Sequence, residues 1–320
     1  MHNLYNFLAR IIVGLVKKFQ IKKNFTNNLI FNVGLNSLIH NKKLYEKTKN
    51  IQENELKIYS QNGEDGIIDF LLYKLRILKP NFIEIGVGEY VESNTRFLYE
   101  RFYPRGIIID CLEDLDKKVF SNVSRWKGDL KVLENFVASD NIDSLISKNC
   151  DFDVDLFSID IDGTDYWVID KLKPNFSKIF VAEYNAVFGD IFDISIPNIK
   201  NFDRKSYHHS HLCYGMSLRA LIRIMKEKGF YFIGTNNFRN NAFFINETFS
   251  HNEYFSCLDK MDDNNLSQHT NSLYKESRDK FGKLNFLKGN QRLDDIKECE
   301  IIDFTDQNGT LKKIKDLNNY

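Results

Sequence analysis

The sequence has no excess charge of either sign. Its 320 residues include 44 Lys and Arg and 44 Asp and Glu, so the formal net charge is zero. Without a net positive field, a protein needs a local basic patch to hold DNA or RNA, and the central part of the sequence contains none. A nucleic-acid partner is therefore not predicted.

Cysteine pairs are also missing. The five cysteines are scattered, no two form a CxxC pair, and their number is odd. This pattern argues against a disulfide framework and against a cysteine-based zinc site. It indicates reduced thiols, so we expect a cytoplasmic protein.

The chain has no uninterrupted apolar run long enough for a transmembrane helix. Apolar residues recur at helical spacing in residues 1–23, but Asn, Arg and Lys interrupt them, whereas a bilayer span needs about 20 apolar residues. No small-residue signal-peptide cleavage site follows. We predict an amphipathic helix that either contacts the inner face of a membrane peripherally or packs on its own domain or a second subunit.

The most informative stretch is FIEIGVGEYVESNT, residues 82–95. An apolar run ends in a turn with Gly86 and Gly88, and a polar segment then opens an amphipathic run. This order predicts a strand, a tight turn and the start of a helix. Such a unit opens a doubly wound α/β domain, in which a ligand lies against the turn and the helix N-terminus.

A third glycine is absent from this turn. The dinucleotide-binding pattern places it where Val91 stands, and the shorter pattern of many S-adenosylmethionine enzymes places it at Tyr90. Two glycines alone are also compatible with a plain tight turn. The missing glycine makes the usual loop geometry an open question, but leaves the strand and helix predictions intact.

Acidic residues surround the turn. Glu84, Glu89 and Glu92 would repel a pyrophosphate, whereas they would attract a sulfonium and an amino group. The turn therefore favours S-adenosylmethionine over NAD. The residues predicted here to bind the cofactor are Glu84, Gly86, Gly88 and Asn94.

Two segments carry a family resemblance. SQNGEDG (residues 60–66) and FIEIGVGEYVESNTRFL (residues 82–98) resemble the FkbM-type methyltransferases, a branch of the class I S-adenosylmethionine-dependent enzymes. The resemblance extends over about residues 59–246. It implies methyl transfer to a hydroxyl of a sugar or a related polar glycan metabolite, as in polysaccharide biosynthesis.

The resemblance also implies an architecture. We expect a Rossmann-like, doubly wound α/β sheet of seven mostly parallel strands that ends in an antiparallel hairpin, here residues 230–235 and 242–245. The predicted division is an N-terminal helix and extension (1–55), a methyltransferase-like domain (56–250) and a C-terminal tail packed on that domain (251–320).

Strand ends supply the remaining cofactor contacts. The second strand, residues 105–111, carries Asp110 at its tip, where a carboxylate accepts hydrogen bonds from both ribose hydroxyls. Glu113 takes this role if the strand ends later. The third strand is predicted at residues 130–138, which places Ser139 near the adenine.

The fourth strand ends in a dense acidic motif, DIDGTD, with Asp160, Asp162 and Asp165. These acids cannot all be buried and ionised, so a positive or protic partner is expected. In one interpretation they face the methyl-transfer site. In the other, DIDGT is the motif of haloacid-dehalogenase-like phosphatases, with Asp160 as nucleophile, Asp162 as general acid and Mg²⁺. The glycine turn that precedes it argues against the phosphatase, which carries this motif on its first strand.

The fifth strand, residues 178–184, brings Glu183 and Asn185 to the same edge of the sheet. Carboxylate and amide oxygens on neighbouring strand tips suit Mg²⁺, so Asp160, Asp162, Glu183 and Asn185 are the predicted metal ligands. Alternatively, Glu183 and Asn185 bind substrate or loop backbone.

Residues 186–214 form a long connection, predicted to be a substrate lid, that contains His208, His209 and His211. Zn²⁺ would need two further ligands, which the sequence nearby lacks. His208 is instead a candidate general base. The predicted catalytic residues are Asp160, Asp162, Glu183 and His208. A non-catalytic binding protein on a degenerate methyltransferase fold remains a further alternative.

Overall fold

The computed structural model describes residues 25–249, 251–259, 265–270, 276–306 and 309–317. The amphipathic segment predicted at residues 1–23 lies outside these residues. Within the described part of the chain, no helix has both the length and the apolar character needed to cross a membrane.

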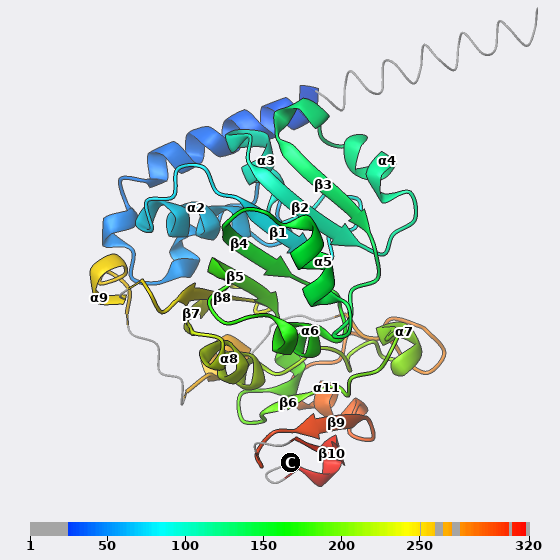
Figure 1. The fold of residues 1–320 in the computed structure, drawn as a ribbon. Helices are drawn as coiled ribbons and strands as arrows, with labels where there is room; N and C mark the ends of the chain where they lie inside the picture. Colours follow the sequence, from blue (N-terminus) through cyan, green and yellow to red (C-terminus); the bar gives the residue numbers. More distant parts are fainter. Residues whose placement is uncertain (1–24, 250, 260–264, 271–275, 307–308, 318–320) are drawn as a thin grey trace, which may run out of the picture.

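A seven-stranded sheet forms the centre of the molecule, with the order β3-β2-β1-β4-β5-β8-β7 (Figure 1). The pairs among β1 to β5 are parallel, and β8 is antiparallel to both β5 and β7. The strands are β1 (Phe82–Ile85), β2 (Arg105–Asp110), β3 (Asp129–Glu134), β4 (Val154–Ile159), β5 (Ser177–Glu183), β7 (Phe230–Thr235) and β8 (Asn241–Asn246). The predicted fold class and the closing hairpin are confirmed.

Helices cover both faces of the sheet. One face packs on α2 (Glu64–Lys74), α3 (Arg96–Phe102) and α4 (Leu115–Phe120), and the other on α5 (Ile142–Asn149), α6 (Asp165–Lys171) and α8 (Leu218–Glu227). Parallel strands buried on both sides are expected to be apolar throughout. Ile107, Ile108 and Ile109 of β2 show this, because all three are at most 1% exposed.

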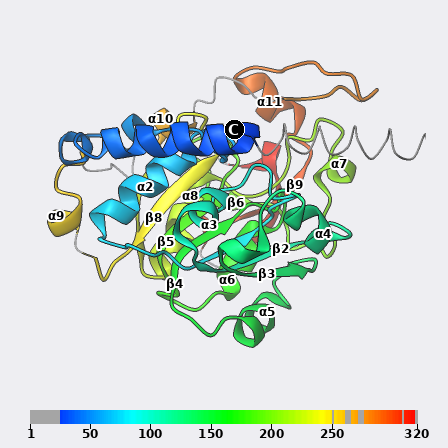
Figure 2. The same ribbon diagram turned by 90° about the horizontal axis from the view of Figure 1, so that it is seen from above.

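The first described residues, 25–41, are helical. Leu38 of this helix is buried against Tyr59 and Phe97, so the helix lies over the face that carries α2 and α3. Figure 2 shows it on the opposite side of the molecule from α5 and α6. Two short turns of 3-10 helix follow it, at Tyr45–Lys47 and Ile51–Asn54.

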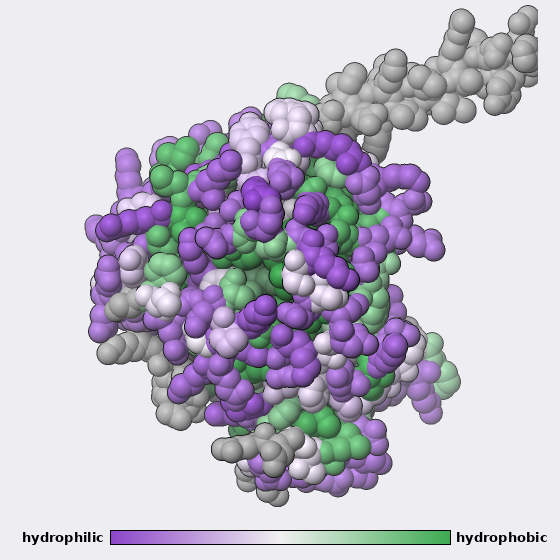
Figure 3. All heavy atoms as spheres, viewed as in Figure 1, coloured by the Kyte–Doolittle hydropathy of each residue, from purple (hydrophilic) through white to green (hydrophobic). Residues whose placement is uncertain are grey.

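A small second sheet joins two segments that are far apart in the sequence. Its strands are β6 (Ile194–Ser195), β9 (Glu300–Asp303) and β10 (Thr310–Lys313), in the order β10-β9-β6, and its pairs are antiparallel. The shorter helices are α7 (Arg204–Tyr207), α9 (His251–Tyr254), α10 (Ser267–Thr270) and α11 (Asn290–Asp295). In the space-filling view, polar residues cover much of the visible face (Figure 3). Apolar groups lie among them, including some at the bottom of the view, where Figure 1 shows the small sheet.

The structure changes one sequence-based expectation and adds to another. The third strand was predicted to reach residue 138, but it ends at Glu134. The last hydrogen bond to β2 is the one from the N–H of Asn135 to Asp110 O, at 2.9 Å. The C-terminal residues, predicted to pack on the domain, share a hydrophobic core with the connection at 186–214 around Ile194, Cys213 and Ile301, a partner that the sequence did not specify.

Candidate active site

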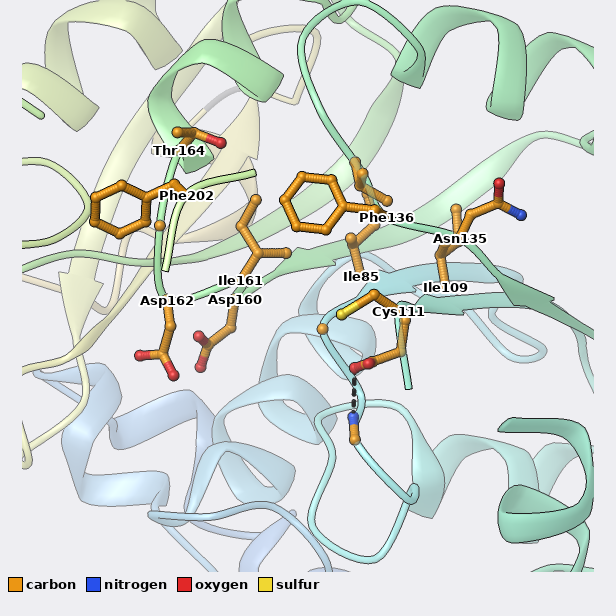
Figure 4. A pocket seen from close by; sticks show the side chains of 15 residues that line it. Ile85, Ile109, Cys111, Asn135, Phe136, Asp160, Ile161, Asp162, Thr164 and Phe202 are labelled. Atoms are coloured by element: carbon orange, nitrogen blue, oxygen red, sulfur yellow. Dashed lines mark hydrogen bonds between the residues drawn. The ribbon is translucent and has the colours of Figure 1, made fainter. Parts of the chain in front are cut away.

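A cavity of about 360 Å³ lies at the carboxyl ends of β1, β2 and β4. The strand order reverses there, because the chain builds β1, β2 and β3 outward and then returns to β4 on the other side of β1. Open α/β sheets bind ligands at such a switch point. Figure 4 shows the residues from Asp160 to Thr164 on one side of the cavity, and Ile109, Cys111 and Asn135 on the other.

Gly86 opens the turn after β1 and has no room for a side chain. Its φ is +85°, and a Cβ atom would lie 1.5 Å from the main-chain oxygen of Asp160. Its N–H donates to Ile109 O at 2.9 Å, so the turn is held between β2 and β4. A glycine is required here by the close approach of two main-chain segments.

Gly88 has the opposite surroundings. Its φ is +52°, but a Cβ atom would meet nothing within 4 Å, and the residue lines the cavity. Its N–H donates to Asp110 Oδ2 at 2.7 Å. The space beside this glycine allows a ligand to approach the main chain closely.

Tyr90 stands where the third glycine is missing, and it adopts the conformation that a glycine would. Its φ is +59°, while its ring is fully buried and its hydroxyl lies 2.9 Å from Thr95 Oγ1. A non-glycine residue with positive φ is unfavourable unless the surroundings hold it. Burial and this hydrogen bond hold Tyr90, so the loop keeps its turn without the glycine.

Glu84, predicted to contact the cofactor, holds the start of α3. Its carboxylate accepts hydrogen bonds from the main-chain N–H groups of Asn94 and Thr95 and from the hydroxyls of Ser93 and Thr95, at 2.5 to 3.0 Å. Burial raises the pKa of Glu84, although these hydrogen bonds oppose the shift. Asn94 in turn donates from Nδ2 to Ser158 Oγ at 3.0 Å, which links the turn to β4.

Asp110 lies at the tip of β2 and lines the cavity, at the place predicted for a ribose contact. Besides the bond from Gly88, its Oδ1 accepts from the N–H of Leu112 at 3.0 Å. Each carboxylate oxygen can accept further bonds. Glu113, the alternative, is exposed and is not among the residues that line the cavity.

The far end of the cavity is formed by residues that the sequence interpretation missed. Because β3 ends at Glu134, the residues at its tip are Asn135, Phe136 and Val137, and these line the cavity. Ser139, predicted to meet the adenine, is not among the lining residues and instead lies 3.0 Å from Asn198 Nδ2. The predicted strand end was wrong, and this displaced the predicted contact.

A second cavity, of about 460 Å³, adjoins the first across the glycine turn. Gly86, Gly88 and Asp160 line both cavities. Its lining is polar, with the amides Gln61, Asn94 and Asn241 and the acidic residues Glu84, Glu89, Glu92 and Asp160. Asn241 Oδ1 is buried and has no hydrogen-bond partner among the described residues. The two cavities meet at the glycine turn and Asp160, and together they are called the cleft below.

Three predicted acidic residues do come together. Asp160, Asp162 and Glu183 each offer an oxygen, and these oxygens lie within 4.8 Å of one another. Burial raises the pKa of Asp160 well above its usual value, and the charge of Glu183 and a hydrogen bond with it add to the shift. Two carboxyl groups can share a hydrogen bond only if one holds a proton, and the raised pKa of Asp160 favours a proton on that member of the pair.

Arg204 supplies the expected positive partner. It comes from α7 and forms an ion pair with Asp162, and its guanidinium lies 4.6 Å from the centre of the Tyr214 ring. The Tyr214 hydroxyl donates to Glu183 Oε1 at 3.3 Å. No motif near the acids indicates these two residues, because both belong to the connection at 186–214.

Asp165, the third acid of the motif, shapes the loop. Its carboxylate accepts from the N–H groups of Ile161 and Gly163, each at 3.0 Å. Burial raises its pKa to about 6, against these hydrogen bonds. Asp165 thus fixes the turn that presents Asp160 and Asp162, and Asp162 itself has a φ of +53° there.

Asn185, the fourth predicted metal ligand, has a different role. It is fully buried, its Nδ2 donates to the main-chain oxygens of Leu212 and Tyr214, and its Oδ1 accepts from the N–H of Val187. These bonds anchor the connection at 186–214 to the end of β5. A side chain committed in this way does not complete the acidic cluster.

His208, the predicted base, is placed with other partners. Its ligand atoms group with those of His209 and Asp295, and its Nδ1 lies 2.7 Å from Ser210 Oγ. His211 lies 2.7 Å from Arg278. The structure therefore groups His208 with a second cluster and not with the three acids.

Comparisons with known proteins give similarity of fold only. No protein-family model and no curated protein match the sequence, so the FkbM resemblance stays a prediction.

Among solved structures, a Clostridium acetobutylicum S-adenosylmethionine-dependent methyltransferase is similar to this chain. It is 9% identical over 57% of this chain and 90% of its own, with a TM-score of 0.39. A Bacillus cereus O-methyltransferase in complex with SAH is 17% identical over 55% and 76%, with a TM-score of 0.32. The Methanococcus jannaschii fibrillarin pre-rRNA processing protein is 10% identical over 53% and 67%, with a TM-score of 0.36. Similarity at this level carries no functional conclusion.

Proposed function

We propose that this protein is an S-adenosylmethionine-dependent methyltransferase that acts on a hydroxyl of a sugar or a related polar glycan metabolite. The observation that carries the proposal is the cleft at the switch point of the sheet. Gly88 and the Asp110 carboxylate line the first cavity, and Asp160, whose carboxyl group lies close to that of Glu183, lines both cavities. A nucleoside-containing cofactor and an acidic reaction site would thus adjoin.

The first cavity fits an adenosyl group by its chemistry. Asp110 has spare acceptor capacity for ribose hydroxyls, and Phe136, which is 41% exposed, offers a ring face with Ile161 nearby. The acidic turn disfavours a pyrophosphate and suits the positive charges of S-adenosylmethionine. Gly88 leaves room for the ligand beside the main chain.

Bound S-adenosylmethionine supplies an electrophilic methyl group, and the protein must then manage the proton of the acceptor hydroxyl. The ionised carboxylate of the Asp160–Glu183 pair takes that proton. Burial and then the charge of Glu183 raise the pKa of Asp160, so this carboxyl group keeps its proton to a higher pH than an ordinary aspartate. Tyr214 and Arg204 orient the pair and balance its charge.

The polar second cavity, lined by amides and carboxylates, supports a polar acceptor. Gln61, Asn94 and Asn241 provide donors and acceptors suited to hydroxyl groups. The Oδ1 atom of Asn241 is buried away from water and accepts no hydrogen bond within the described residues, which costs free energy. A sugar hydroxyl that donates to it would remove this cost, whereas an apolar acceptor would not.

Mg²⁺ was predicted because Asp160, Asp162, Glu183 and Asn185 bring oxygen ligands to neighbouring strand tips, where the acids need a positive partner. Arg204 removes this reason, since it pairs with Asp162, and Asn185 is committed elsewhere. The three remaining carboxylates have the oxygen donors that Mg²⁺ prefers. We propose proton removal by the carboxyl pair alone, so chelation should leave activity unchanged.

The phosphatase alternative fits the electrostatics poorly. Its nucleophile would be Asp160, whose raised pKa disfavours the ionised form that must attack phosphorus. Its general acid would be Asp162, which is already the partner of Arg204. The motif also follows β4, in the middle of the sheet, rather than the first strand of the domain.

The test is acceptor-dependent formation of S-adenosylhomocysteine. Purified protein is incubated with S-adenosylmethionine and a panel of sugars, nucleotide sugars and oligosaccharides, with EDTA or with Mg²⁺. We expect turnover with at least one acceptor, equal in both conditions. Loss of turnover in EDTA would restore the metal. Hydrolysis of a phosphate ester without S-adenosylmethionine would favour the phosphatase, and cofactor binding without turnover would favour a non-catalytic protein.

A further inference from the structure

A second cluster of ligand-type side chains lies outside the cleft. His208 and His209 follow α7, and Asp295 ends α11, so the cluster joins the connection at 186–214 to the C-terminal region. Each side chain offers one ligand atom, and these atoms lie within 4.8 Å of one another. The centres of the two imidazole rings are 4.2 Å apart.

One carboxylate oxygen of this cluster has no hydrogen bond. Asp295 Oδ2 is buried and unbonded within the described residues, and it lies 3.8 Å from His209 Nε2, which is charged only when protonated. A buried carboxylate oxygen without a hydrogen bond is costly. A cation between the carboxylate and the imidazoles would remove that cost.

Contacts with Ser210 fix the ring of His208. Its Nδ1 lies 2.7 Å from Ser210 Oγ and 3.3 Å from the main-chain nitrogen of Ser210. These contacts leave Nε2 as the ring nitrogen for a metal, and binding there requires the tautomer in which Nδ1–H donates to Ser210 Oγ.

We propose that His208, His209 and Asp295 bind a divalent transition-metal ion such as Zn²⁺. Two imidazole nitrogens and one carboxylate oxygen are a known ligand set for such ions, with a fourth position left for water. This set has no suitable spacing in the sequence, because Asp295 belongs to a segment far from the histidines and only the fold brings it near.

The site would stabilise the region beside the cleft. The metal would tie the chain just after α7 to α11, and α7 carries Arg204, the partner of Asp162. Phe202, next to α7, lines the first cavity. A bound metal would therefore hold the residues that close this side of the cleft, without taking part in proton removal.

The experiment is titration of untagged, metal-free protein with Zn²⁺ alone, with Co²⁺ absorption as a second measure of coordination. The variants are Asp295→Asn and His209→Gln, and the matched controls are the adjacent Asp294→Asn and the nearby His211→Gln. We expect one equivalent bound, a loss of about 10-fold or more in affinity in both variants, and controls within about 2-fold of the unchanged protein. Thermal unfolding without metal checks that each variant folds. His209 is exposed, so replacing it should disturb folding less than replacing Asp295.

The proposal is overturned if no stoichiometric binding is found, or if both variants bind as the unchanged protein does. It is also overturned if Asp160→Asn or Glu183→Gln abolishes binding instead, since the ion would then belong to the acidic cluster. The measurement uses no S-adenosylmethionine, so failure of the proposed methyl transfer would not affect its result.

Discussion

The two halves of the cleft are built by different means. Around Gly86, Gly88 and Asp110, main-chain N–H groups and one carboxylate make contacts within a strand–turn–helix unit and its neighbouring strand. Around Asp160 and Glu183, charged side chains from distant segments make the contacts. The first half depends on backbone shape and the second on electrostatic balance.

This difference teaches where each half is vulnerable. A substitution in the glycine half acts through steric clash and cofactor contact, so it changes folding or binding. A substitution in the acidic half acts through protonation, so it changes turnover and pH dependence while binding of the cofactor persists. The predictions that follow separate these outcomes, from the largest effect to the smallest.

Gly86→Ala should strongly destabilise the fold, because the new Cβ would overlap the main chain at Asp160 and φ is +85°. We expect a loss of more than about 4 kcal/mol in the free energy of unfolding. Gly88→Ala is the matched control, since its Cβ meets nothing, and should cost only about 1 to 2 kcal/mol. Urea denaturation measures both, and equal losses would contradict the account.

Asp160→Asn and Glu183→Gln should each lower kcat by about 10² to 10⁴-fold, the range for removing a general base. For Glu183→Gln the dissociation constant of S-adenosylmethionine should stay within about 2-fold, since Glu183 does not line the cavity that contains Asp110. Glu227→Gln, an exposed residue of α8, serves as control. Full activity in both site variants would remove the acidic half from catalysis.

Asp165→Asn tests the buried acid of the loop by pH. Its pKa is about 6 when folded and 3.8 otherwise, so the folded state keeps the proton longer and stability falls as pH rises between these values. The unchanged protein should lose on the order of 3 kcal/mol relative to the variant between pH 3.8 and 6. The exposed Asp143→Asn should leave this slope intact. Unfolding curves with the same pH slope for Asp165→Asn and the unchanged protein would mean that Asp165 is not the responsible group.

Asp110→Ala should weaken S-adenosylmethionine binding by about 1.5 to 3 kcal/mol, the scale for lost hydrogen bonds to a charged group. Glu113→Ala, three residues along and exposed, should have little effect. Calorimetric titration of both folded variants gives the comparison. If Glu113→Ala caused the larger loss, the ribose contact would have to be reassigned.

Arg204→Gln should shift the pH dependence of turnover. Removing a positive charge near the carboxyl pair raises the apparent pKa of the base, so the rising limb of the kcat profile should move to higher pH by roughly one unit. Arg125→Gln, which removes a surface ion pair on α4, is the control. An unchanged profile would show that Arg204 does not act on the pair.

The glycine half could be predicted from the sequence because its signals are local. An apolar run, two glycines and the acid at the next strand tip indicated β1, the turn and Asp110 with nearly correct boundaries. The error at β3 arose because the apolar residues 136–138 follow the last residue that hydrogen-bonds to β2, which is Asn135. The pattern of residues does not show where pairing with β2 stops, and Phe136 was therefore missed while Ser139 was chosen.

The acidic half was predicted in part. The motif indicated that Asp160, Asp162 and Glu183 would meet, but the partners Arg204 and Tyr214 come from a connection without periodicity. Asn185 illustrates the opposite limit, because its position at a strand tip suggested a ligand, whereas burial gave it main-chain partners. Such choices depend on long-range packing, which a single sequence does not encode locally.

The most direct test of the account is calorimetric titration of the unchanged protein with S-adenosylmethionine, S-adenosylhomocysteine and NAD. We predict that the first two bind at one site and that NAD does not bind. In a folded Gly88→Val variant, the added side chain should occupy space that the cofactor needs, so binding should be at least about 10-fold weaker. Absence of binding by both S-adenosyl compounds, or binding unaffected by Gly88→Val, would contradict the assignment of the cleft.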